Sequence, residues 1–269
     1  MNVILNKLEI WKQNLVNKQH YIPCCYSKNF SKQPNLKRNS MVYKLNCSDW
    51  IISEDNVENL FISESNRYSL LKNWDRNDCI EHELAGVETK FSKAYSWLMK
   101  SIINKNLKWF SKDSMENIIV FITFLNHRYD SFYDESSSRV KNENMNELSK
   151  KQYITLMSSQ IEVLESCKWN FFISSDKPVI LVDKNPVNLR NFTLRQNTSQ
   201  IYFPINKNYC LRFSDLWQSE FRNFTNNSII KLNLEDTKKT NYYIYKWCIK
   251  ECFSHNKNLL RNYYKLLKK

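Results

Sequence analysis

The sequence predicts an α+β fold, in which a mainly helical N-terminal two-thirds is followed by a C-terminal antiparallel sheet and a terminal helix. Two observations support this order. Stretches with apolar residues at every third or fourth position run through the first part of the chain, whereas short apolar runs with turn residues between them follow after residue 170. Because helices precede strands instead of alternating with them, α+β is favoured over α/β.

The first part of the chain is predicted to be helical apart from one hairpin, which pairs two alternating segments across a turn at Asn46–Asp49. The helix that begins near Asp113 is apolar almost all round, so we expect it to be the central buried helix. The predicted elements are, in chain order, an amphipathic helix at 2–17, an extended aromatic segment at Gln19–Ser31, strands at Met41–Leu45 and Trp50–Ser53, short helices within Asn56–Trp74, and long helices at Cys79–Asn104 and Asp113–Tyr129.

The second part begins with a segment rich in Ser, Asn and charged residues, 134–151, which predicts a mobile loop. A helix to Ser166 follows, and Asp236 is expected to cap a final helix that runs to Phe253. The predicted strands between them are Phe171–Ile173, Val179–Val182, Gln200–Ile205, Tyr209–Phe213 and Ile229–Leu234. We expect one compact domain over residues 1–269, with a sub-division into 1–133 and 152–269 on either side of the loop.

Composition narrows the range of functions. The chain has one glycine, Gly86, which excludes a P-loop, a G-x-G-x-x-G dinucleotide motif and a G-x-S-x-G nucleophile elbow. The longest apolar run, Ile118–Leu125, is too short to span a bilayer, and the first residues lack a signal-peptide core, so we expect a cytoplasmic protein that makes no membrane contact. The net charge of +13 suits a nucleic-acid partner, although abundant Lys and Asn also fit an AT-rich genome.

The chain has eight cysteines and no C-x-x-C pair, which favours core cysteines in a reducing compartment. A zinc site from Cys248, Cys252 and His255 is conceivable, but the sequence shows no fourth ligand. A nucleophilic pair between His20 and the adjacent Cys24 or Cys25 is weakly supported, since it needs surroundings that stabilise a thiolate.

Two carboxylates lie where apolar residues are expected. In the helix from Cys79, stepping back by seven residues from Ile102 and Tyr95 gives Glu88 and then Glu81, so both fall on the seam that should face the core. A buried carboxylate needs a cation, a metal or a strong hydrogen-bond donor. The pair therefore indicates either a functional site or a buried ion pair that holds helices together.

Several segments together resemble the bacterial family catalogued as domain of unknown function 4238. The match begins with a His-Tyr-x-Pro-x-x-Tyr-x-x-x-Phe signature and covers most of the chain, with departures at Ser27, where the family usually has Leu, and after Arg128. The residues that carry the resemblance are His20, Tyr21, Pro23, Tyr26, Phe30, Ile80, Glu81, Glu88, Arg128, Ser175, Asp176, Pro178, Val179, Phe203, Pro204, Ile205 and Asn241. The resemblance supplies candidate positions and no activity.

The candidate catalytic residues are His20, Glu81, Glu88, Arg128 and Asp176. Carboxylates suit Mg²⁺ or Mn²⁺, which Glu81 and Glu88 would bind and which would activate water. Arg128 would clamp a phosphate, and His20 would act as a general base or a ligand. These residue types predict a metal-dependent nuclease for RNA or DNA, such as a bacterial toxin or a phage-defence effector.

The candidate substrate-binding residues are aromatic or basic: Tyr21, Tyr26, Lys257, Arg261 and Lys265. The three basic residues lie in an amphipathic C-terminal segment, which would grip a phosphate backbone, dock on a protein partner or pack on its own domain. Aromatic side chains stack on bases, so RNA is the favoured partner.

The alternative function is a non-catalytic module that binds nucleic acid or protein, with a structural Glu–Arg–His cluster. In that case Arg128 neutralises Glu88 between two packed helices, and His20 pins the N-terminal segment. For Asp176 the role of an ordinary turn residue ahead of Pro178 is favoured.

Overall fold

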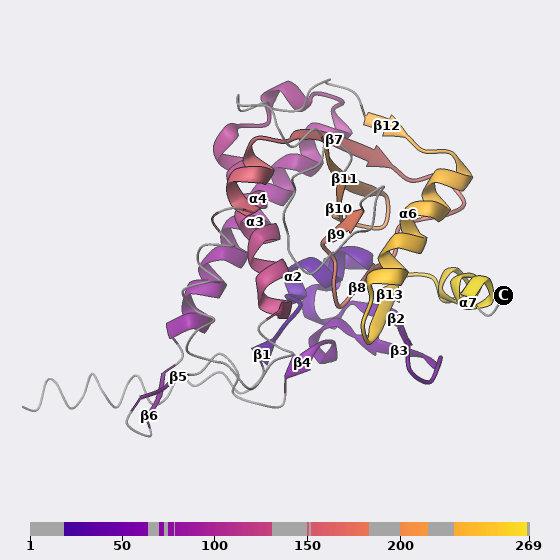
Figure 1. Cartoon of the computed structure of the whole chain (residues 1–269), viewed down its shortest axis with the longest axis horizontal. Helices are drawn as coiled ribbons and strands as arrows, with labels where there is room; N and C mark the ends of the chain where they lie inside the picture. The colour runs from indigo at the N-terminus through magenta and orange to yellow at the C-terminus, as the bar shows by residue number, and fades with distance from the viewer. Residues whose placement is uncertain are drawn as a thin grey trace, which may run out of the picture.

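The computed structural model describes residues 19–63, 70–72, 75–77, 79–130, 150, 152–182, 200–214 and 229–267, with side chains for all of these except 19, 63, 70–72, 75–77, 79–83, 109, 127–130 and 264–267. At its centre lies a five-stranded mixed sheet of order β12-β7-β11-β10-β9 (Figure 1). β12 is parallel to β7, and the other neighbours are antiparallel. The strands are β7 (Gln160–Glu165), β9 (Ile180–Val182), β10 (Gln200–Pro204), β11 (Tyr209–Ser214) and β12 (Ile229–Lys231).

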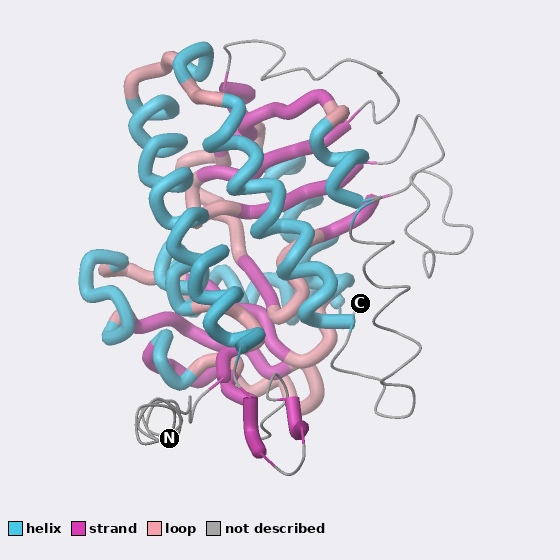
Figure 2. Tube along the Cα trace, turned by 90° about the vertical axis from the view of Figure 1, so that its left-hand side faces the viewer, coloured by secondary structure: helices cyan, strands magenta, loops and turns pink. Residues whose placement is uncertain are grey.

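Helices cover both faces of this sheet. α3 (Cys79–Ile103) and α4 (Lys112–Asp130) lie over one face, as Figure 2 shows, and α6 (Leu234–Trp247) packs on the other. Side chains alternate along a strand, so neighbouring residues enter different cores. In β10, Phe203 packs with α3 and α4, whereas Tyr202 packs with α6.

α3 and α4 form an antiparallel pair joined by a short connection that contains η4 (Leu107–Trp109). Phe91 of α3 stacks on Phe121 of α4, with ring centroids 3.7 Å apart and planes 10° from parallel. The prediction that the second helix is buried is confirmed, since Phe121 and its neighbours Ile118, Ile119 and Ile122 have no exposed surface. Ser111, whose Oγ accepts a hydrogen bond from the Ser114 N–H at 3.2 Å, caps α4.

A second sheet corrects the predicted fold class. It has four antiparallel strands in the order β3-β2-β13-β8. They are β2 (Met41–Asn46), β3 (Ile52–Asn56), β8 (Ser174–Ser175) and β13 (Glu251–Ser254). The β2–β3 hairpin was predicted, but its partner strands come from the other end of the chain. The α+β class holds, whereas the division into a mainly helical N-terminal two-thirds and a C-terminal sheet is wrong.

Short elements complete the N-terminal part, where strands replace the helices predicted within Asn56–Trp74. β1 pairs with β4 and β5 pairs with β6, both antiparallel. The elements are β1 (Gln19–His20), α2 (Cys24–Ser27), η1 (Lys28–Phe30), η2 (Pro34–Asn39), η3 (Val57–Asn59), β4 (Ile62–Ser63), β5 (Leu70–Lys72) and β6 (Asp75–Asn77).

Two predicted helices are shorter than expected because strands follow them closely. The helix expected to reach Ser166 occupies residues 152–157, and β7 then pairs with strands on both sides. The final helix ends at Trp247, where Cys248 turns to an extended backbone (φ −61°, ψ 140°), and β13 follows. The predicted helix at 2–17 and most of the loop at 134–151 lie outside the described residues. No helix among the described residues has the length and hydropathy needed to cross a membrane.

Tyr26 of α2 ties the two sheets together. Its side chain has no exposed surface, and its ring stacks on Phe203 with centroids 5.3 Å apart. Its hydroxyl donates to the Pro204 carbonyl of β10 at 2.8 Å and therefore accepts from the Ser174 hydroxyl of β8, also at 2.8 Å. One buried hydroxyl thus bonds to a strand of each sheet.

We predict that Tyr26→Phe lowers the free energy of unfolding by about 1–3 kcal/mol, because a buried carbonyl and a buried hydroxyl each lose a partner. Urea unfolding measures this change. Tyr242→Phe is the matched control, since Tyr242 is 40% exposed and its substitution should alter stability by less than about 0.5 kcal/mol. Equal stability of the Tyr26→Phe and wild-type proteins would contradict the role given to this hydroxyl.

We also predict that acid destabilises the fold through His255. Burial lowers the pKa of this histidine from 6.5 to about 4, and its ring packs against Phe171 with centroids 4.8 Å apart. The unfolded chain binds the proton first, so the stability that a neutral His255 provides is present above pH 6.5 and is lost as the pH falls toward about 4.

Urea midpoints measured across this pH window test the role of His255. His255→Phe keeps the ring contact and removes the proton site, so its midpoint should fall less steeply with acid than that of the wild-type protein. Identical pH dependence in the two proteins would rule His255 out as the source.

Candidate functional site

Glu88 lies on α3, its charge acts on the two cysteine thiols of α2, and it is not among the buried residues of the core. Its residue is partly buried. One turn later, the Ser92 hydroxyl donates to the Glu88 backbone carbonyl at 2.9 Å and also bonds to the Cys25 thiol. The core-facing row of α3 that the sequence predicted is therefore present, but Glu88 lies where this row reaches the protein surface.

Two adjacent thiols face Glu88 from α2. Burial, with the nearby Glu88 charge, raises the pKa of Cys25 to about 12. Burial also raises the pKa of Cys24 to about 11, against the opposing effect of Arg38. Both thiols are protonated at neutral pH, which argues against a Cys–His nucleophile at this place.

His20 reaches the same region from β1. Its Nε2 lies 2.8 Å from the backbone carbonyl of Glu58. A carbonyl only accepts, so Nε2 carries the proton in the neutral ring and Nδ1 carries the lone pair. His20 thus holds the η3 turn in place through Nε2.

A second carboxylate, Glu58, completes this region. Its charge and those of Arg38 and Glu88 all act on the Cys24 thiol. Arg38 forms a long ion pair with Glu58, at 4.0 Å and largely in solvent, which contributes little to stability. We refer to His20, Cys24, Cys25, Glu58 and Glu88 as the His20–Glu88 region.

A shallow groove of about 520 Å³ runs along α3 from this region. The described residues of its lining carry hydroxyl groups, ammonium groups and an indole: Thr89, Ser92, Lys93, Ser96, Trp97 and Lys100. Trp97 is 62% exposed, and the Lys100 ammonium lies 5.3 Å from the centre of its ring. Residues four apart share one side of a helix, so Glu88, Ser92 and Ser96 form one row that leads into the groove.

Glu81 and Arg128 belong to the same end of the helix pair, but their side chains lie outside the described residues. Phe91 stacks on Phe121, and the two helices are antiparallel. The last turn of α4, which carries Arg128, therefore lies level with the first half of α3, which carries Glu81 and Glu88. The predicted ion pair or phosphate clamp at Arg128 stays a prediction.

Asp176 has a different role from the residues of the His20–Glu88 region. It is 1% exposed, and its two carboxylate oxygens accept the backbone N–H groups of Ile249 and Lys250 at 3.1 and 2.7 Å. Burial raises the pKa of this carboxyl group, and the backbone hydrogen bonds oppose that rise. Asp176 fixes the turn between α6 and β13, which differs from the role of an ordinary turn residue ahead of Pro178 that the sequence favoured.

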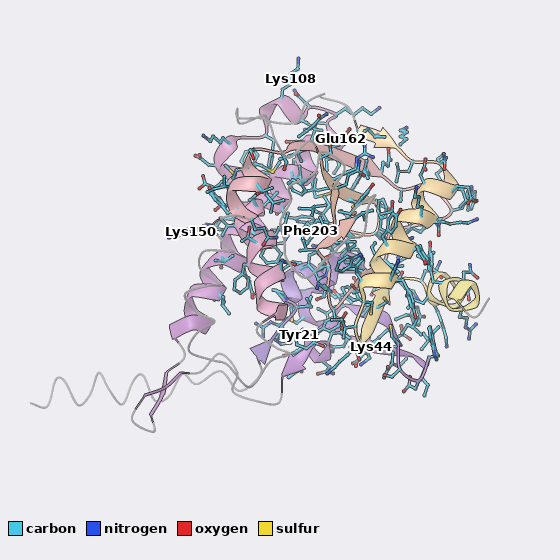
Figure 3. All side chains as sticks on the ribbon, in the orientation of Figure 1. Tyr21, Lys44, Lys108, Lys150, Glu162 and Phe203 are labelled. Carbon is cyan, nitrogen blue, oxygen red and sulfur yellow. The ribbon has the colours of Figure 1, made fainter. Side chains whose placement is uncertain are left out.

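The structure describes the surroundings of two candidate substrate-binding residues, Tyr26 and Tyr21. Full burial keeps Tyr26 from touching a substrate, so that assignment is corrected. Tyr21, labelled in Figure 3 near β1 and β4, packs its ring edge against Phe61 at 5.3 Å between centroids. The aromatic signature segment thus acts chiefly in packing.

The basic C-terminal helix, α7 (Lys257–Leu267), packs on its own fold. Leu259, Leu260 and Tyr263 are buried in the core beside α6, which leaves Arg261 exposed. The side chain of Lys265 lies outside the described residues. α7 and α3 lie at opposite sides of the molecule in Figure 1, so Lys257 and Arg261 do not line the groove on α3.

Among the described side chains, one group has the spacing of metal ligands, and it is formed by Cys47, Cys248 and Cys252. Sequence reasoning paired the last two with His255 and missed Cys47, which is 201 residues from Cys248. No local pattern connects residues so far apart. Glu88 does not belong to a group of three such ligands among the described side chains.

Comparisons with known proteins identify one family. The model of a family described as "Protein of unknown function (DUF4238)" matches residues 18–154 and 129–258. No curated protein and no solved structure matches the chain.

Proposed function

The chain belongs to the DUF4238 family, and we propose that it is a metal-dependent nuclease that acts on RNA or DNA, with single-stranded RNA the favoured substrate. One observation carries the proposal: the partly buried carboxylate of Glu88 stands at the end of the hydroxyl-, lysine- and tryptophan-lined groove on the same helix. In this proposal, a site for chemistry and a surface for a strand adjoin on α3.

The lining of the groove suits a single strand better than a duplex. An exposed indole stacks on any base, and stacking contributes about 1–3 kcal/mol per base. Lys93 and Lys100 offer positive charge to the phosphates on either side of Trp97, and the hydroxyl groups offer further hydrogen bonds. The net charge of +13 would draw a polyanion toward the protein.

The proposed chemistry uses a hard cation. Glu81 and Glu88 are two helical turns apart, about 10 Å along the axis, so they would line one site without sharing an ion symmetrically. Mg²⁺ or Mn²⁺ bound through Glu88 would activate water and stabilise charge on the phosphate. His20 would accept the proton at Nδ1, because Nε2 is committed to the Glu58 carbonyl. A toxin or phage-defence effector would use such an activity.

One observation favours the alternative, a non-catalytic module that binds nucleic acid or protein. The polar groups whose contacts are described, His20 and Asp176, each hold backbone atoms of a neighbouring turn. In this case Glu88 is a structural carboxylate, and the groove only binds.

We predict that Glu88→Gln abolishes cleavage while leaving the thermal midpoint nearly unchanged, since the substitution keeps the shape of the side chain. The assay incubates the chain with tRNA, single-stranded RNA and single- and double-stranded DNA, each with Mg²⁺, Mn²⁺ or EDTA. Glu235→Gln is the control, because the side chain of Glu235 is 79% exposed on α6. Nucleic acid left intact under every condition would remove the enzyme proposal, and a loss of stability in Glu88→Gln would favour the structural role.

We also predict that Trp97→Ala weakens binding of a short single-stranded RNA by at least about fivefold, which corresponds to about 1 kcal/mol for one lost stack. Fluorescence anisotropy of labelled RNA measures the affinity. Trp169→Ala is the matched control, since Trp169 is 90% exposed and lies outside the groove. Equal loss in both variants, or no loss in either, would show that the groove on α3 is not the binding surface.

A further inference from the structure

Three cysteine thiols from separate segments meet at one end of β2 and β13, the two inner strands of the four-stranded sheet. Cys47 follows β2, Cys248 follows α6, and Cys252 lies in β13. Their sulfur atoms all lie within 4.8 Å of one another, and the sulfurs of Cys47 and Cys248 are 3.2 Å apart. All three are free thiols.

Regular backbone structure holds each thiol in place. β13 pairs with β2 in the register that sets Cys252 opposite Leu45, and the Cys47 N–H donates to the Lys250 carbonyl at 2.7 Å. The Cys248 N–H donates to the carbonyls of Ile244 and Tyr245, both at 3.1 Å, where α6 ends. The cluster is therefore formed by the fold itself, and a ligand would meet it largely preorganised.

We propose that Cys47, Cys248 and Cys252 bind one thiophilic divalent cation, with Zn²⁺ the favoured ion. Zn²⁺ takes thiolates at about 2.3 Å in tetrahedral geometry, which places two sulfur ligands about 3.8 Å apart. The Cys47 and Cys248 sulfurs, 3.2 Å apart, are closer than this value, and no pair of the three is separated by more than 4.8 Å, so small side-chain rotations would complete the three bonds. Each thiol that binds gives up its proton to solvent.

The surroundings of the cluster suit an ion that enters from solvent. Cys252 is buried, whereas Cys47 and Cys248 are partly exposed, so one side of the cluster is open. The buried carboxylate of Asp176 bonds to the Cys248 thiol and to the backbone of the next two residues. Asp176 would thus hold Cys248 in position without binding the metal itself. A water molecule would be the fourth ligand.

The earlier expectation of a site with His255 is corrected. The imidazole of His255 packs against Phe171, and it is absent from the group with ligand spacing. The third ligand is Cys47, which belongs to the N-terminal hairpin. An ion held here would clamp that hairpin to the C-terminal strand and to the end of α6.

The test is a titration of the purified full chain, kept reduced, with Co²⁺ and then Zn²⁺. Co²⁺ bound by thiolates gives charge-transfer absorption in the near ultraviolet, which Zn²⁺ should abolish by displacement at one ion per chain. Zn²⁺ should also raise the thermal midpoint. Cys47→Ser and Cys248→Ser should each weaken binding at least tenfold, and Cys167→Ser is the matched control, because Cys167 is partly exposed and outside the cluster.

Absence of charge-transfer absorption from the wild-type chain would overturn the proposal, as would full binding by Cys47→Ser and Cys248→Ser. Loss of two thiols to a disulfide under reducing conditions, with no metal bound, would also overturn it. Thermal midpoints taken without metal show whether the variants fold, and the wild-type titration decides the proposal even if one of them does not. The outcome is independent of the nuclease proposal, because it is read from metal binding alone.

Discussion

The buried hydroxyl of Tyr26 is the contact on which the arrangement of this fold depends. Each of the two sheets needs a cover for an apolar face, and α2 fills the space where β8 of one sheet approaches β10 of the other. The Tyr26 ring supplies the apolar contact with Phe203, and the hydroxyl satisfies one polar group of each strand. A phenylalanine would fill the same volume and leave both polar groups unpartnered, so the tyrosine specifies position as well as packing.

That anchor determines what lies on either side of it in the chain. Cys25 immediately before Tyr26 contacts Ser92 on α3, and His20 at the start of the segment holds the η3 turn. The N-terminal segment is therefore fixed against the first half of α3, where Glu88 stands at the edge of the core. The described lining of the groove begins at Thr89, the next residue of the same helix, so the geometry of the proposed site follows from the packing of α2.

The sequence predicted the elements whose patterns are local, and it missed the pairing of strands that are far apart in the chain. The helix beginning at Cys79 and the buried α4 were predicted almost to their ends, because helical periodicity is local. The β2–β3 hairpin was also predicted from alternation and a turn. The pairing of β2 with β13 joins residues about two hundred positions apart, and no local pattern reports it, which is why the predicted separation of helices from sheet failed.

The same distinction between local patterns and long-range contacts applies to the candidate residues. The Glu81/Glu88 spacing predicted two carboxylates facing the core. The structure shows Glu88 only partly buried, and the side chain of Glu81 lies outside the described residues, so that half stays a prediction. Tyr26 and Asp176 stood out as polar or aromatic residues in a signature, and burial reveals that their partners are backbone and side-chain groups of the fold. Cys47 carried no signal, because its neighbours Cys248 and Cys252 are brought to it by the sheet.

We propose that α3 presents one continuous surface for a nucleic-acid strand, ending at Glu88. Photo-crosslinking of single-stranded RNA to the protein, followed by mass spectrometry of the crosslinked peptides, tests this proposal. We expect crosslinks in the peptide of α3 that contains Trp97. Crosslinks confined to α7, or none on α3 at saturating RNA, would contradict it.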